Sequence, residues 1–258
     1  MSRSTLAVLS VVAVIALVVG GYLAYDTFLR GDSTPALALP SSSPDALASD
    51  DPTTPPSASA DAGASTEPAA SVDTGTDGEL AGVWVISQAE AGYRVREQLA
   101  NLPAESDAVG RTSDVTGSIT LEGSGDAVQL TGGTIEVDTT TIASDESRRD
   151  NRMRSEGLET DAFPTATFTI TGPVAVPAAA LAGTASDLTL VGDLTLHGVT
   201  KSVEIPAQAQ LVDGVVQVAG TLAFPLSDYD IVAPNVGGFI VSIADQGTLE
   251  FLASFTKS

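Results

Sequence analysis

One short charged stretch constrains the fold of this chain more than any other feature. Residues 144–157 (SDESRRDNRMRSEG) are dense in acidic and basic side chains, whereas the segments on either side alternate apolar and polar residues. Asp145–Arg149 and Asp150–Arg154 are spaced as i,i+4 ion pairs with the acid first, an order that stabilises a helix by roughly 0.2–0.5 kcal/mol per pair. Alternation with a period of two is typical of strands. The pattern therefore predicts one short helix inserted into a series of strands.

Alternating segments bounded by turn residues predict the strands. They are residues 82–87, 93–96, 115–121, 134–138, 165–170, 188–196, 203–211, 215–224 and 248–255. Pro164 favours extended chain just before one of them, because a residue preceding proline avoids the helical region. Residues 177–181 are predicted to form a second short helical turn. Many strands with so little helix predict an all-β domain, either a sandwich or an up-and-down barrel.

The N-terminal segment predicts a membrane anchor. Residues 6–24 carry no charge, and 19 helical residues span about 28 Å, close to the hydrocarbon thickness of a bilayer. The alternative is a cleaved secretory signal, whose apolar core is usually shorter, about 7–15 residues. We therefore expect residues 1–30 to form a single-pass anchor in the cell membrane, with the remainder outside the cytoplasm. If the segment is cleaved, the protein is secreted.

Composition divides the remaining chain into a linker and a folded domain. Residues 31–79 are rich in Ser, Thr, Pro, Ala and Asp and contain no basic or aromatic residue, which predicts a disordered linker. Residues 80–258 hold all the predicted strands and form one domain. The formal net charge of −22 repels phosphate backbones, so nucleic acid is excluded as a partner.

The sequence offers little for catalysis or metal binding. It has no cysteine and a single histidine, so thiol chemistry and His/Cys metal sites are excluded. His197 precedes Gly198 in a predicted hairpin turn, and Asp193 lies about 13 Å away along the strand, too far to orient it in a catalytic triad. Asp228-Tyr229-Asp230 lacks the spacing of a calcium loop. We therefore expect no enzyme activity, no cofactor and no metal.

The charged stretch itself has two interpretations. Four of its residues are arginines: Arg148, Arg149, Arg152 and Arg154. They either bind an anion, such as a lipid headgroup at a barrel rim, or form a helix face paired with acids four residues earlier. The second interpretation is favoured, because the acids stand at the required spacing.

Two motifs resemble the YceI-like family. Residues 148–168 (RRDNRMRSEGLETDAFPTATF) are similar to its arginine–aspartate helix and the Phe/Tyr-Pro-x-x-x-Phe segment that follows. Residues 192–201 (GDLTLHGVTK) are similar to its strand–turn–strand signature. Residues 87–91 (SQAEA) depart from it, since they lack the histidine of the family's Asp-x-x-His-Ser turn. The resemblance implies an extended antiparallel, lipocalin-like barrel with a long apolar cavity that binds a polyisoprenoid or another long-chain lipid.

On this basis we predict an extracytoplasmic lipid carrier or sensor, tethered to the membrane through its N-terminal helix. The alternatives are a structural or adhesive β module without a small ligand, and an enzyme that acts on a bound lipid through His197. Apolar residues on the strands are candidates to line the cavity, or else to pack in an ordinary core. They are Trp84, Tyr93, Val95, Ile119, Leu121, Ile135, Val137, Phe168, Ile170, Leu194, Leu196 and Phe224.

Overall fold

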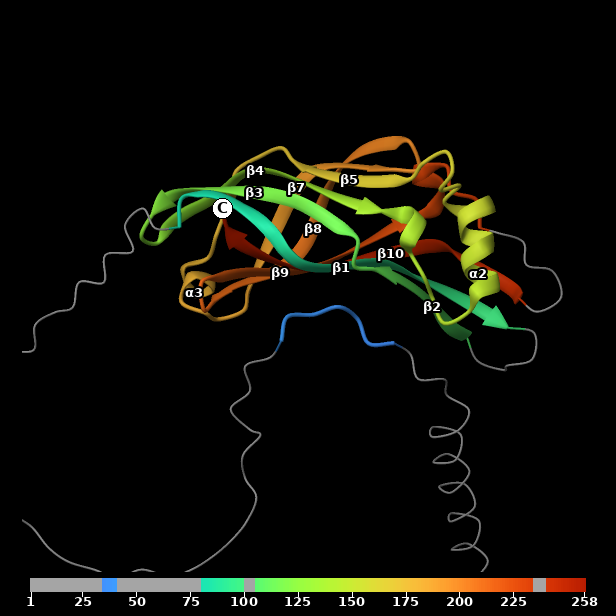
Figure 1. Cartoon of the computed structure of the whole chain (residues 1–258). Coiled ribbons are helices and arrows are strands. Elements are labelled where there is room, and N and C mark those ends of the chain that lie inside the picture. Colours follow the sequence, from blue (N-terminus) through green and yellow to red (C-terminus); the bar gives the residue numbers. More distant parts are fainter. Residues whose placement is uncertain (1–33, 41–79, 100–104, 234–239) are drawn as a thin grey trace, which may run out of the picture.

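The folded domain is a closed antiparallel barrel (Figure 1). The computed structural model describes residues 34–40, 80–99, 105–233 and 240–258. Within these ranges eight strands form the ring in the order β1-β3-β4-β5-β7-β8-β9-β10, and β10 pairs back to β1. Their bounds are β1 Gly82–Leu99, β3 Val115–Ser124, β4 Ala127–Asp138, β5 Thr165–Ile170, β7 Ser186–Leu196, β8 Val199–Val212, β9 Val215–Pro225 and β10 Ile240–Lys257. The ring confirms the all-β prediction and decides between sandwich and barrel.

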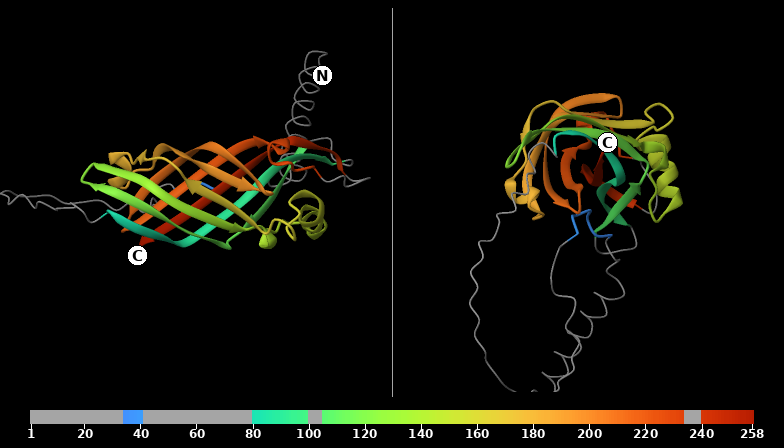
Figure 2. Two further views of the ribbon diagram at one scale, coloured as in Figure 1. Left: turned by 90° about the horizontal axis from the view of Figure 1, so that it is seen from above. Right: turned by 60° about the vertical axis from the view of Figure 1, so that its left-hand side comes forward.

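The strands that close the ring extend beyond it at one end. β1 and β10 have 18 residues each and run steeply across the barrel (Figure 2). Residues 82–85 of β1 pair with β3, whereas residues 91–98 pair with β2, Glu105–Thr112. The last part of β1 therefore leaves the ring together with β2 and β10. This end lies beside the helix in Figure 1.

The predicted helix is present between β4 and β5. After a 3₁₀ turn, η1 (Thr139–Thr141), the chain forms α2 (Ser147–Arg152), which continues as a π-helical turn, η2 (Met153–Gly157). The second predicted turn is α3, Ala178–Leu181. The remaining short elements are β6, Val174–Ala175, which pairs with β4, and the 3₁₀ turn η3, Leu226–Tyr229.

One of the two predicted helix ion pairs forms and the other does not. Arg149 donates to Asp145 at 2.5 Å, as predicted. The prediction of an Asp150–Arg154 pair is wrong. Asp150 is buried and accepts hydrogen bonds from the backbone N–H and the hydroxyl of Ser144, at 2.9 and 2.6 Å. Arg154 donates to two backbone carbonyls of the loop that precedes the helix. Both residues therefore fasten the helix to that loop.

Side chains from the inner faces of the strands fill one end of the barrel. Trp84 and Phe255 are 2% and 3% exposed there, and the indole N–H of Trp84 donates to the carbonyl of Leu80 at 2.9 Å. A second apolar cluster, nearer the helix, includes Leu196, Phe224 and Tyr229.

The predicted anchor lies outside the described residues, as does most of the predicted linker. Among the helices that the structure does describe, none combines the length and the apolar character needed to cross a bilayer. Residues 34–40, which the prediction assigned to the disordered linker, are described and lie against the outside of the barrel (Figure 1).

Candidate functional site

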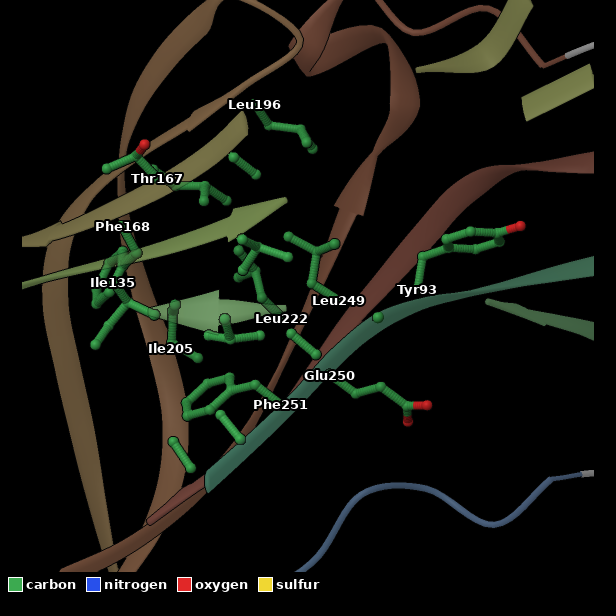
Figure 3. Close-up of a pocket in the computed structure, with 18 of the residues that line it drawn as sticks. Tyr93, Ile135, Thr167, Phe168, Leu196, Ile205, Leu222, Leu249, Glu250 and Phe251 are labelled. Atoms are coloured by element: carbon green, nitrogen blue, oxygen red, sulfur yellow. The ribbon is translucent and has the colours of Figure 1, made fainter. Parts of the chain in front are cut away.

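The barrel encloses an apolar cavity of about 170 Å³. All eight strands of the ring contribute to its wall, and Met153 and Leu158 reach it from η2 and the loop that follows. In Figure 3 the side chains of Ile205, Leu222 and Leu249 point into a common space, although they come from three different strands. The centre of the barrel is therefore not filled by its own side chains.

Ten of the twelve predicted lining residues lie in the cavity wall. They are Tyr93, Val95, Ile119, Ile135, Val137, Phe168, Ile170, Leu194, Leu196 and Phe224. The other two, Trp84 and Leu121, are 2% and 4% exposed and pack in the filled end of the barrel instead. Alternation identifies the inner face of a strand but not the depth at which the interior becomes filled. That these residues bind a ligand stays a prediction.

Small residues help to explain why the middle of the barrel is hollow. Ala89 and Ala91 of β1 and Ala253 of β10 line the cavity, whereas Trp84 and Phe255 stand on the same two strands a few residues nearer the filled end of the barrel. The prediction missed these alanines, and it also missed Leu249 and other large residues of β7 to β10. The signal was present in the sequence. Where alanine alternates with polar residues along a strand, the alanines face the interior but leave most of the space in front of them empty.

The cavity offers few polar side chains to a ligand. Among the residues that line it, those with N–H, O–H or carboxylate side chains are Glu90, Tyr93, Thr139, Thr167 and Glu250. Figure 3 shows the carboxylate of Glu250 turned away from the apolar side chains. A wall of this kind suits an apolar chain, because an unpaired polar group buried beside it would cost several kcal/mol.

A buried ion pair fixes the helix to the strands that extend beyond the ring. Arg149 of α2 donates to Glu97 of β1 at 2.7 Å, and Glu97 is 3% exposed. Burial alone disfavours the charged guanidinium, but the carboxylates of Glu97 and Asp145 outweigh it, so the pKa of Arg149 is raised. Through this contact α2 holds Met153 against the end of the cavity.

The phenol of Tyr93 lies beside this ion pair, and burial raises its pKa from an ordinary value of 10.0 to about 12. Arg149 opposes the shift, whereas Asp150 and Glu97 add to it.

We expect stability to fall as pH rises from about 10 to about 12, by roughly 2–3 kcal/mol in total, because the unfolded phenol loses its proton before the folded one does. Tyr93→Phe removes this contribution. Urea unfolding of both proteins across this pH range measures the difference. Parallel pH profiles for the two proteins would contradict the assignment.

His197 has a structural position. It is 9% exposed, and together with Gly198 it forms the predicted turn between β7 and β8, both residues having positive φ values of 51° and 74°. Its Nδ1 lies 3.0 Å from the carbonyl oxygen of Tyr229, and its Nε2 lies 2.9 Å from a carboxylate oxygen of Glu159. Phe163 packs on the ring at 4.5 Å between centroids. Both ring nitrogens thus hold neighbouring loops together.

The remaining charged candidates are also engaged by the protein. Arg152 pairs with Glu156 at 2.7 Å. Three of the four arginines, Arg149, Arg152 and Arg154, thus donate to carboxylates or carbonyl oxygens of the domain. Among these three, only Arg149 has the predicted acid four residues earlier, since Arg152 pairs with an acid four residues later and Arg154 contacts backbone carbonyls. Asp228 pairs with Lys201 at 2.8 Å. The part of the chain that the structure describes contains no cluster of three or more His, Cys, Asp or Glu suited to a metal ion.

The chain is similar to one family of domains in sequence and to several solved structures. The sequence profile of the YceI-like domain matches residues 84–255. A polyisoprenoid-binding domain from Saccharophagus degradans, implicated in plant cell wall breakdown, is 19% identical with a TM-score of 0.52, and the match covers 68% of this chain and 98% of that one. BcnA of Burkholderia cenocepacia is 16% identical with a TM-score of 0.47, covering 65% and 94%. A YceI protein of Campylobacter jejuni is 13% identical with a TM-score of 0.42, covering 55% and 82%. No curated protein matches the chain by sequence.

Proposed function

Because the chain belongs to the YceI-like domain family, we propose that it is a binding protein for a polyisoprenoid or a similar long-chain apolar lipid. The observation that carries the proposal is the apolar cavity of about 170 Å³ inside the barrel. The alternative, a structural or adhesive module, requires an interior filled by side chains. A hollow interior favours the binding protein.

The physical chemistry of such a ligand fits the cavity wall. Enclosing one five-carbon isoprene unit removes roughly 100 Å² of apolar surface from water, which contributes about 2.5 kcal/mol before the cost of ordering the chain. Binding of this kind needs no catalytic residue, and the proposed role is that of a carrier or sensor rather than an enzyme.

The proposal places the barrel outside the cytoplasm and next to a membrane. Two features of the sequence support this location. The uncharged run of residues 6–24 has the length of a single membrane span, and a polar sequence separates this run from the barrel. A lipid carrier is useful where it can reach a bilayer, and an anchor provides that proximity.

The proposal is tested by identifying what the purified full chain carries. We expect native mass spectrometry to show about one long-chain lipid per chain, and solvent extraction to release an isoprenoid. A protein that is folded by circular dichroism, yet carries no lipid and takes up no added polyisoprenol, would refute the binding function. Detergent micelles without protein serve as the blank for nonspecific extraction.

A further inference from the structure

A short segment far from the barrel in sequence lies on the barrel's outer wall. This segment, residues 34–40 (TPALALP) and called the strap below, is separated from β1 by residues 41–79. Figure 1 shows it beneath β1 and β10. It holds no helix or strand, and the side chains of two barrel arginines donate hydrogen bonds to it.

Two arginines of the barrel bind the backbone of the strap. Arg94 of β1 donates to the carbonyl oxygen of Thr34 at 2.8 Å, and Arg111 of β2 donates to the carbonyl oxygen of Pro35. The strap forms no helix or strand, so its backbone carbonyl oxygens are free to accept hydrogen bonds from side chains. A guanidinium is a strong donor to such an oxygen because it is charged.

A buried carboxylate orients the two arginines. Glu250 of β10 is 2% exposed and lies on the outer face of its strand, turned toward the strap in Figure 3. It accepts from Arg111 at 2.9 Å and from Arg94 at 3.4 Å. A charge buried on the outside of a barrel needs both partners and cover from water, and the strap contributes to that cover.

The apolar side chains of the strap also face the barrel. Leu39 is 8% exposed and Leu37 is half-buried, whereas Ala36 and Ala38, which alternate with them, are exposed. Leu37 and Ala38 border a groove over β7, β8 and β9 that includes Pro206. The strap therefore has one face that contacts the protein and one that contacts solvent.

We propose that this outer surface is a docking site whose occupant is the strap of the same chain, and that docking limits how far the barrel can move from the membrane. The second part rests on the proposed anchor. From the end of the apolar run, residues 25–33 span at most about 30 Å when fully extended. With the strap released, residues 25–79 form a single tether that reaches roughly 190 Å at full extension.

The absence of native cysteine allows a direct test on the full chain. Pro40→Cys in the strap and Glu204→Cys on β8 are both exposed positions for spin labels, and pulsed electron paramagnetic resonance measures the distance between them in bilayer nanodiscs. We expect one narrow distance distribution. Leu39→Asp should broaden it, because the carboxylate would be buried, whereas Ala36→Asp, on the exposed face, should leave it unchanged.

Other outcomes would overturn the proposal. A broad distribution in the labelled parent chain would mean that the strap does not dock. A narrow distance that disappears on dilution with unlabelled protein would place a neighbouring chain's strap in the groove. Lipid uptake measured on the same samples is expected to be the same with and without Leu39→Asp, since the strap lies outside the cavity. Failure of docking is thus distinguishable from failure of lipid binding.

Discussion

Replacing Leu249 with tryptophan is expected to reduce the lipid carried by the barrel by about tenfold or more, which corresponds to about 1.4 kcal/mol or more of binding free energy. Leu249 points into the centre of the cavity, where Leu222 and Ile205 approach it from neighbouring parts of the wall (Figure 3). A bulkier side chain there occupies space that the ligand needs. The protein should still fold, because a large apolar residue placed in a hollow does not displace a packed neighbour.

The matched control inserts the same residue on the outside of the barrel. Val191 of β7 is 40% exposed, so that Val191→Trp adds an indole without entering the cavity, and bound lipid should be unchanged. Native mass spectrometry of the two variants after identical purification makes the comparison. Equal lipid content in both would show that the ligand does not occupy this cavity.

The largest loss of stability is expected for Arg149→Ala, at about 3–5 kcal/mol. The substitution leaves Glu97, which is 3% exposed, as a buried charge without its guanidinium partner. Arg152→Ala is the control within the same helix, because the Arg152–Glu156 pair is about half exposed and such pairs contribute roughly 0.2–1 kcal/mol.

Urea unfolding followed by tryptophan fluorescence measures both changes, since Trp84 is the one tryptophan of the chain and lies buried inside the barrel. Similar losses for the two variants would mean that Glu97 is hydrated in solution. If Arg149→Ala also loosens α2, the cavity-lining Met153 should become more readily oxidised, and peptide mass spectrometry would detect this change.

Local patterns identified most of the strands and the helix, but not how the strands meet. Alternation of apolar and polar residues marks an inner face whatever the partner strand is, so β7, β8 and β9 were found from their own sequences. The pairing of β10 with β1 depends on contacts between distant segments, and so does the path of the last part of β1, which leaves the ring and pairs with β2. For this reason the sequence alone left sandwich and barrel as alternatives.

The candidate site was predicted in part for the same reason. Tyr93 and Val95 were assigned to the cavity by alternation and do line it, and the same spacing places Glu97, which is 3% exposed, on the same face of β1 two residues further on. A carboxylate at such a position indicates a buried partner, but nothing local identifies it as Arg149, which lies more than fifty residues away. The role of Glu250 escaped prediction similarly, because two of its partners come from β1 and β2.

The seam between β1 and β10 has a consequence for when the cavity closes. These are the first and last strands of the barrel, and they pair along their whole length, from Trp84–Lys257 to Leu99–Ile240. The ring therefore cannot close until β10 has been synthesised, and until then the inner faces of the other strands have no wall on that side. For the lipid proposed above, this order of events allows a long chain to be enclosed from the side as β10 pairs with β1, so that loading does not require threading through the finished wall.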